Sequence, residues 1–255
     1  TGGSIAGQKQ VGGVAGYNGI VGIITNVYNT GAVDGLTDVG SMAGSNEGKV
    51  TNAYNTGTVS ASNNDVTDVG GVVGANKGTV THVHNTGMVS GYRGAGGVVG
   101  YNNGGGTIED AYNTGAVNGN NNVGGVAGSN VGSTITNVYN TGMVSGSKDY
   151  VGGVVGSNRN DLFKKSTITN VYNTGAVSGN AHVGGVAGSN VDNKNYAEST
   201  IANAYNTGTV SGSKDYVGGV VGDNKGTSTD VHTTEPQTHK NHACRLPLEK
   251  KKRTT

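Results

Sequence analysis

Residues 151–158 read VGGVVGSN and residues 172–179 read YNTGAVSG, and these two phrases alternate along most of the 255-residue chain. The first, called here the Gly-Gly phrase, begins at Val11, Val39, Val69, Ala95, Val123, Val151, Val183 and Val217. The second, the Tyr-Asn phrase, begins at Tyr28, Tyr54, His84, Tyr112, Tyr139, Tyr172 and Tyr205. A unit of this length that recurs many times is typical of stacked coils rather than of a globular domain.

The spacing of the units varies only at fixed places. Successive Tyr-Asn phrases lie 26, 30, 28, 27, 33 and 33 residues apart. The differences fall mainly after the Asn that closes the Gly-Gly phrase, as at 159–166 and 191–199, and after the Val-Ser-Gly end of the Tyr-Asn phrase, as at 61–68. Stacked coils tolerate such changes in their surface loops, because contacts between coils are unaffected. We therefore expect these segments to be loops.

The composition excludes a core of bulky side chains, since the chain has 49 glycines, no tryptophan and one phenylalanine, Phe163. Helices are not expected, because no apolar stripe with helical spacing exists and glycine and β-branched residues dominate. One unit alone buries almost nothing, whereas units stacked about 4.8 Å apart pair their backbones with the coils above and below. The prediction is an all-β fold, a parallel β-solenoid of about eight coils with one repeat of 26–33 residues per coil.

Three apolar positions recur in the units and predict one continuous narrow core. They are the Ile or Val before Thr-Asn, the Val or Ala before the Tyr, and the Val before Ser-Gly, as in Ile168, Val171 and Val177. The third lies six residues beyond the second and hence on the same side of an extended chain. The first and second are three residues apart, which would put them on opposite faces of a straight strand. We therefore expect a bend at Thr-Asn.

Side chains alternate in direction along an extended strand, so the inward Val before Ser-Gly fixes the direction of the side chains in the Tyr-Asn phrase. Its Asn is expected to point inward and to form a ladder with the copy in the next coil or with the turn backbone. This column is Asn29, Asn55, Asn85, Asn113, Asn140, Asn173 and Asn206. The preceding rings, Tyr28, Tyr54, His84, Tyr112, Tyr139, Tyr172 and Tyr205, are expected to form a stacked outward stripe. A structural ladder and a binding platform for glycans or a partner protein are both open interpretations of this stripe.

The insertion at 159–166 is the least repetitive surface segment among the repeats. It contains Phe163, Lys164 and Lys165, an aromatic ring followed by two positive charges. Binding residues concentrate on loops carried by a rigid scaffold. These three residues therefore join the Tyr column as the predicted ligand surface.

Motifs of catalysis and metal binding are missing. The nearest approach to a zinc-protease motif, His239 to His242, lacks both the interval and the carboxylate. The Gly-rich phrases are followed by no helix and no Gly-Lys-Ser/Thr, so we expect no phosphate loop. Carboxylates such as Asp38 and Asp68 fall in expected turns, and the nonapeptide of calcium-binding solenoids is absent. We expect no enzyme, no cofactor and no metal site.

Charge divides the chain into two parts. Residues 1–227 carry 11 Lys/Arg and 13 Asp/Glu, a net charge of −2, and are assigned to the solenoid. Residues 228–255 carry 6 Lys/Arg and 3 Asp/Glu, a net charge of +3, and are expected to be a disordered basic tail, with a shifted reading frame as a second explanation. The repeats lack the basic stripe of a nucleic-acid binder. No run approaches about eighteen apolar residues, so no membrane insertion is expected.

The unit Val-Gly-Gly-Val-Val-Gly-x-Asn, followed by Gly-Thr-Ile/Val-Thr-Asn-Val/Ala-Tyr-Asn-Thr-Gly-x-Val-Ser-Gly, resembles the GLUG motif from Val11 to Gly226. Val154 and Met42 depart from the Leu that the motif's name implies. The motif occurs in large bacterial surface and secreted proteins, including filamentous-haemagglutinin-like adhesins and non-catalytic stretches of immunoglobulin A proteases.

The resemblance implies an extracellular or cell-surface stalk or adhesive segment. The partners that it implies are host glycans or surface proteins, together with flanking repeats of the parent chain. The alternative is a polysaccharide-acting enzyme or a glycan-binding module on the same scaffold. An enzyme should break the repeat pattern where unlike residues converge, whereas the departures here are confined to loop lengths.

Overall fold

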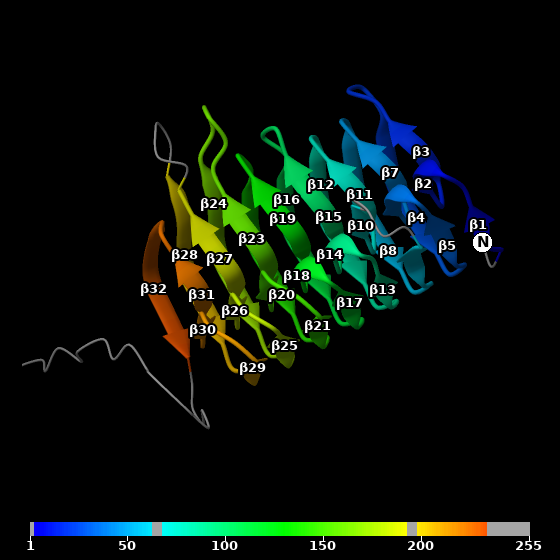
Figure 1. Cartoon of the computed structure of the whole chain (residues 1–255). Coiled ribbons are helices and arrows are strands. Elements are labelled where there is room, and N and C mark those ends of the chain that lie inside the picture. Colours follow the sequence, from blue (N-terminus) through cyan, green and yellow to red (C-terminus); the bar gives the residue numbers. More distant parts are fainter. Residues whose placement is uncertain (1–2, 63–67, 193–197, 234–255) are drawn as a thin grey trace, which may run out of the picture.

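The chain forms a parallel β-solenoid of eight coils in a computed structural model that describes residues 3–62, 68–192 and 198–233 (Figure 1). Each coil contributes one strand to each of four parallel sheets, A to D. Figure 1 shows the coils stacked into a rod, from the blue N-terminal coil to the orange last coil. Seven steps of about 4.8 Å give a rod of about 34 Å. The predicted fold class is confirmed.

The strands of each sheet come from successive coils. Sheet A contains β1 (Ile5–Ala6), β5 (Val33–Gly35), β9 (Val59–Ala61), β13 (Val89–Ser90), β17 (Val117–Gly119), β21 (Val144–Gly146), β25 (Val177–Gly179) and β29 (Val210–Gly212). Sheet B contains β2 (Lys9–Gly12), β6 (Thr37–Gly40), β10 (Val69–Gly70), β14 (Arg93–Gly96), β18 (Asn121–Gly124), β22 (Val151–Gly152), β26 (Val183–Gly184) and β30 (Val217–Gly218).

The other two sheets carry the longer strands. Sheet C contains β3 (Ala15–Asn18), β7 (Ala43–Asn46), β11 (Val73–Asn76), β15 (Val99–Asn103), β19 (Ala127–Val131), β23 (Val155–Arg159), β27 (Ala187–Val191) and β31 (Val221–Asn224). Sheet D contains β4 (Ile23–Asn29), β8 (Lys49–Asn55), β12 (Thr79–Asn85), β16 (Thr107–Asn113), β20 (Thr134–Asn140), β24 (Ser166–Asn173), β28 (Ser199–Asn206) and β32 (Thr227–Thr233).

The predicted bend at Thr-Asn is confirmed inside the strands of sheet D. The residue at the bend has a left-handed backbone with φ between 49° and 56° in all eight coils: Asn26, Asn52, His82, Asp110, Asn137, Asn170, Asn203 and Asp230. Asn and Asp adopt this conformation more readily than other side chains that carry a Cβ. In a straight strand, side chains three residues apart would lie on opposite faces. Because of the bend between them, Ile168 and Val171 both point inward and are buried.

The interior is divided into two apolar clusters, whereas one continuous core was expected. The larger cluster holds the Ile/Val and Val/Ala columns of sheet D together with the two apolar residues that follow Gly-Gly, as in Val154 and Val155. The smaller holds the Val column of sheet A and the first residue of the Gly-Gly phrase, as in Val177 and Val183. All three predicted apolar columns are therefore inside, but the third packs separately from the other two.

The two phrases pack against each other across the coil. A Cβ added to Gly125, the second glycine of its Gly-Gly phrase, would overlap the carbonyl oxygen of Gly153 and Cγ of Asn140. The same relation holds for Gly97 with Asn113 and for Gly153 with Asn173. The glycine therefore makes room for the Asn of the Tyr-Asn phrase, which explains why the two phrases always occur together.

The structure corrects the position at which the repeats were expected to end. The predicted boundary at residue 227 is six residues too early, because β32 extends to Thr233 and pairs with β28 throughout. Val231 lies opposite Ala204 and packs against the larger core cluster. Backbone pairing and this one apolar side chain keep the strand in register, although Ser228 and Thr233 replace the usual Ile and Asn. The rest of the predicted tail, 234–255, lies outside the described residues.

The loop predictions concern three segments. Residues 160–165 connect β23 to β24 as expected. Parts of the other two, 63–67 and 193–197, lie outside the described residues. In the part of the chain that the structure describes, no helix is long and apolar enough to cross a membrane.

Candidate ligand-binding surface

The aromatic column of sheet D forms the outward stack that the sequence predicts. Parallel strands place these rings opposite one another in register. Five consecutive contacts from Tyr28 to Tyr172 have ring centroids 4.8–5.2 Å apart and planes within 9° of parallel. Tyr28, Tyr54, Tyr172 and Tyr205 are exposed, while His84, Tyr112 and Tyr139 are half-buried between their neighbours. We call the seven predicted residues, Tyr28 to Tyr205, the Tyr stripe.

The stack is interrupted once within the Tyr stripe. Tyr172 and Tyr205 are register neighbours, yet no stacking contact joins their rings in the described structure, whereas Tyr205 stacks on His232 at 5.3 Å. A surface cleft lies at the interruption and is lined by Asn170, Val171, Tyr172, Asn203 and Tyr205. His232 extends the column by one ring that was not predicted, because residues 228–255 were assigned to the tail.

An exposed ladder of polar side chains runs beside the Tyr stripe at the left-handed bend. Asn203 Nδ2 donates to Asn170 Oδ1 at 3.0 Å, and Asn170 Nδ2 donates in turn to Asn137 Oδ1 at 3.0 Å. Asn137 Nδ2 donates to the carboxylate of Asp110 at 3.2 Å. The surface therefore presents parallel columns of amides and aromatic rings, both suited to neutral polar ligands.

Burial keeps the middle of the Tyr stripe uncharged near neutral pH. The pKa of His84 is lowered because the ring is partly desolvated between Tyr54 and Tyr112. The pKa of Tyr139 is raised by burial and by the neighbouring Tyr112 and Tyr172 hydroxyls. A neutral His84 can thus take the place of a Tyr without putting a charge into the stack.

Two buried amide ladders hold the surface rigid from inside. The predicted ladder is confirmed: each Asn from Asn29 to Asn173 donates to the Asn of the next coil at 2.8–3.0 Å and to the nearby Gly carbonyl of its own turn. A second ladder with steps of 2.7–2.9 Å runs through Asn18, Asn46, Asn76, Asn102, Asn130, Asn158, Asn190 and Asn224. The Asn that closes every Gly-Gly phrase was the sequence signal for this second ladder.

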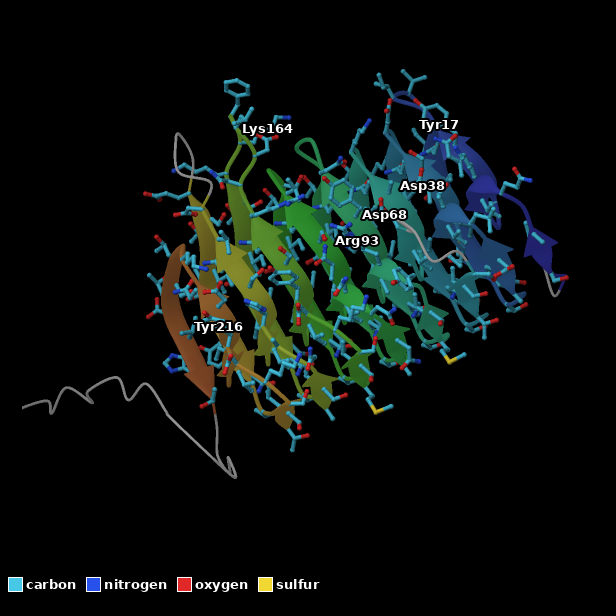
Figure 2. All side chains as sticks on the ribbon, viewed as in Figure 1. Tyr17, Asp38, Asp68, Arg93, Lys164 and Tyr216 are labelled. Atoms are coloured by element: carbon cyan, nitrogen blue, oxygen red, sulfur yellow. The ribbon has the colours of Figure 1, made fainter. Side chains whose placement is uncertain are left out.

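The structure does not bring the predicted loop residues to the Tyr stripe. Asp161 accepts hydrogen bonds from the backbone N–H of Phe163 at 2.7 Å and of Lys164 at 2.9 Å, which lowers its pKa. Lys164 donates to the carbonyl of Gly104, two coils away, and the Phe163 ring is 87% exposed. Figure 2 places Lys164 at the tip of its loop. From Ser166 to Tyr172 the strand spans about 20 Å, so loop and stripe are separate surfaces.

A second aromatic column lies at the corner before sheet B. Tyr150, His182 and Tyr216 have left-handed backbones with φ of 64°, 52° and 61°, and their ring centroids are 4.7 Å apart at both steps. Figure 2 labels Tyr216 in this column. This column was not predicted, although an aromatic residue precedes the Gly-Gly phrase in these three coils.

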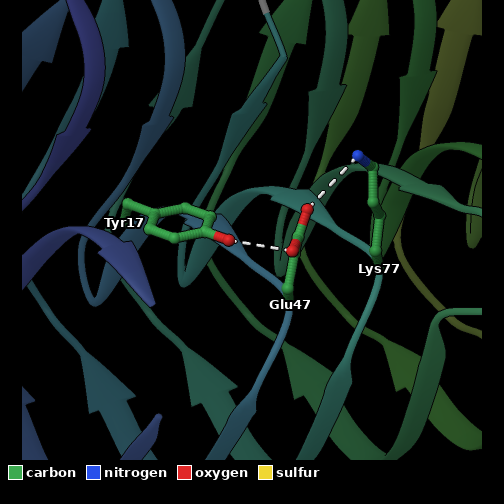
Figure 3. Close-up of polar contacts among 3 residues, drawn as sticks. All are labelled: Tyr17, Glu47 and Lys77. Atoms are coloured by element: carbon green, nitrogen blue, oxygen red, sulfur yellow. Dashed lines mark hydrogen bonds and ion pairs between the residues drawn. The ribbon is translucent and has the colours of Figure 1, made fainter. Parts of the chain in front are cut away.

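Side chains from three coils are also joined at the N-terminal end. Tyr17 donates to Glu47 Oε2 at 2.8 Å and Lys77 lies 3.4 Å from Glu47 Oε1 (Figure 3). These contacts lower the pKa of Glu47, with the Tyr17 hydrogen bond the larger cause. Tyr17 and Lys77 are exposed, Glu47 is half-buried, and the trio links coils one to three.

Acidic and basic side chains meet across coils two to four. The pKa of Asp68 is raised to about 7, mainly by burial and also by the neighbouring charge of Asp38, while Arg93 opposes the shift. The pKa of Asp38 is also raised, mainly by burial. Figure 2 shows Asp38, Asp68 and Arg93 along one side of the rod. Among the described residues, no three His, Cys, Asp or Glu side chains are grouped so that they could hold a metal ion.

Residues 149–178 match the model of a protein family that is described as "The GLUG motif". The chain contains a GLUG motif. The matched segment is one full turn: it includes β22, β23 and β24 and extends into β25, so it visits all four sheets. Because like residues of all eight coils pair in register, the GLUG unit is the coil of this solenoid. No curated protein and no solved structure matches the chain.

Proposed function

We propose that this GLUG solenoid is a structural and adhesive segment of a secreted or cell-surface bacterial protein. In this proposal the Tyr stripe binds host glycans or a host surface protein, and flanking repeats of the parent chain extend the rod. The observation that carries the proposal is the continuous outward stack of rings on one face of the solenoid. Contiguous exposed apolar area of this kind marks interaction sites more often than passive surface.

The interior supports a mechanical role for the same segment. Every coil is joined to the next by the backbone pairing of four strands, and the first seven coils are also joined by both buried amide ladders. Loops such as 160–165 change length without moving these contacts. A rod built this way presents identical side chains at a fixed spacing, which favours extended or repetitive ligands.

A polysaccharide-acting enzyme is the second candidate, and one observation favours it. The solenoid brings Asp38, Asp68 and Arg93 together from three coils, and an acid with a raised pKa is a recognised mark of catalytic sites. Adhesion is preferred because Asp68 is half-buried, whereas four rings of the stripe are exposed to a polymer. Unchanged polysaccharide after incubation with the protein would count against the enzyme, and cleavage abolished by Asp68→Asn would establish it.

The adhesion proposal is tested by removing rings from the middle of the stack. Tyr54, Tyr112 and Tyr139 are changed together to Ser, and binding to a glycan array and to host cells is compared with the parent chain. The matched control replaces three tyrosines outside the stripe, Tyr17, Tyr92 and Tyr101, with Ser. Circular dichroism and thermal melting verify that both variants are folded.

We expect the stripe variant to lose binding and the control to keep it. Equal binding by both variants would contradict an adhesive role for the stripe. No specific binding by the parent chain would instead support a passive stalk.

A further inference from the structure

We propose that the cleft between Tyr172 and Tyr205 is a subsite for one pyranose ring of a neutral oligosaccharide. The proposal rests on the adhesive role of the Tyr stripe and assigns it a ligand class and a location. Elsewhere along the stripe each ring face is covered by the next ring at 4.8–5.2 Å. At this one step the facing sides of two tyrosines are left for a ligand.

The cleft arises from the side chains and not from the backbone. Tyr172 and Tyr205 are paired in the same parallel register as all the other rings, so their strands are no further apart. Tyr205 stacks on His232 at 5.3 Å with planes 26° apart, and no stacking contact joins it to Tyr172 among the described residues. Both tyrosines are exposed, at 43% and 49%. The cleft therefore lies on the side of Tyr205 that faces away from His232.

The amides at the cleft have unused hydrogen-bonding capacity. Asn203 donates to Asn170, but the next residue of that column is Asp230, and an ionised carboxylate cannot donate to Asn203 Oδ1. No hydrogen bond to Asn203 Oδ1 is found among the described residues. Each of the two amide groups also has a second N–H. A ligand with several hydroxyl groups matches this set of acceptors and donors.

Charge and shape restrict the ligand to a neutral sugar. Asp230 occupies the position next to Asn203 in the adjacent strand and would repel a carboxylate or a sulfate. The apolar C–H face of a pyranose can pack on a tyrosine ring while its hydroxyl groups reach the amides. Such a ring meets both requirements at once, aromatic contact on the walls and hydrogen bonding at the edge.

The experiment measures binding of linear hexasaccharides of glucose, N-acetylglucosamine, mannose and galactose to the full chain by calorimetry and saturation-transfer NMR. Tyr205→Ala removes one wall, and Tyr205→Phe keeps it. Asn203→Gly removes the amide while keeping the left-handed backbone accessible. Tyr28→Ala is the control, since it removes an exposed stripe ring far from the cleft. A hexamer of galacturonic acid tests the charge argument.

We expect at least one neutral hexasaccharide to bind and the acidic hexamer not to bind. Tyr205→Ala should weaken binding at least about tenfold, while Tyr205→Phe and Tyr28→Ala should change it less than about twofold. Asn203→Gly should weaken it severalfold. The proposal would be overturned if none of the neutral hexasaccharides bound. Equal losses of binding in Tyr205→Ala and Tyr28→Ala would also overturn it. Host-cell binding that survives Tyr205→Ala but fails in the Tyr54/Tyr112/Tyr139 variant would overturn the cleft alone and leave the adhesive role standing.

Discussion

Changing Asn113 to Asp tests the inner amide ladder with almost no change of shape. Asn113 is fully buried; its Nδ2 donates to Asn140 Oδ1 at 2.9 Å and to the carbonyl of Gly115 at 2.7 Å, and its Oδ1 accepts from Asn85 at 2.8 Å. An ionised Asp could still accept from Asn85. It could not donate to the other two oxygens, and it would repel them.

The magnitude follows from these three contacts. Two buried acceptors lose the Asn113 donor, at about 1–3 kcal/mol each, and the carboxylate is itself desolvated. We expect the free energy of unfolding at pH 7 to fall by about 4 kcal/mol. The desolvated carboxyl should have a raised pKa, so the protonated form should recover one donor at low pH. The loss relative to the parent should therefore shrink as the pH falls from 7 to 4.

Urea unfolding followed by circular dichroism at pH 7 and pH 4 measures both effects. Asn26→Asp is the control, because Asn26 lies at the exposed bend of the first coil and, among the described residues, its side chain only accepts, from Asn52. That control should cost less than about 1 kcal/mol. Similar losses for the two variants, or an Asn113→Asp loss that is the same at both pH values, would show that the buried ladder is not held by its donors.

Two further perturbations probe the electrostatics and the packing of the coil. The pKa of Asp68 is raised from 3.8 to about 7, mainly by burial, although Arg93 opposes the shift. Between about pH 4 and pH 7 the folded state therefore holds a proton that the unfolded state has released, and the free energy of unfolding should decline as the pH rises through this range. At about 1.4 kcal/mol per unit of pKa difference, Asp68→Asn should remove a penalty of up to about 4 kcal/mol at pH 8. The variant should therefore melt at a higher temperature than the parent at pH 8, and this gain should be smaller at pH 4. The same gain at both pH values would refute the reasoning. Gly125→Ala should lower the free energy of unfolding in urea by at least about 3 kcal/mol, because the new Cβ would overlap Gly153 and Asn140. Gly19→Ala is the control and should be nearly neutral, because its Cβ would lie 3.4 Å from the Tyr17 ring. Equal effects of the two substitutions would contradict the packing argument.

The repeat period, the inward columns and the bend could be predicted because each depends on neighbours close in sequence. Alternation along a strand sends Asn173 inward and Tyr172 outward, and the odd step from Ile168 to Val171 requires a turn between them. Stacking then follows from repetition, since any side chain on the outer face meets its own copy in the next coil. The predicted Tyr stripe could be derived for the same reason.

The features that were missed depend on contacts between unlike positions. The cleft lies between two register neighbours that do not stack, and His232, which stacks on the other side of Tyr205, was assigned to the tail once the familiar phrases had ended. Strand β32 is held in register by backbone pairing with β28 and by the packing of Val231, and neither belongs to a sequence motif. Gly125 leaves space for the Asn140 side chain from another strand of the coil. The sequence indicated only that a small residue recurs at the Gly125 position.

The two kinds of amide ladder differ in direction, which links the interior to the proposed binding surface. Inside, each Asn donates toward the coil that follows, as Asn113 does to Asn140. At the exposed bend the donation runs toward the coil that precedes, as from Asn203 to Asn170. An outer ladder of this direction leaves an acceptor open wherever the next residue cannot donate, and Asp230 is such a residue. A one-residue change in a bend can thus create a hydrogen-bonding site on the surface without disturbing the oppositely directed ladder that stabilises the coil, so surface chemistry can vary from coil to coil while the fold stays the same.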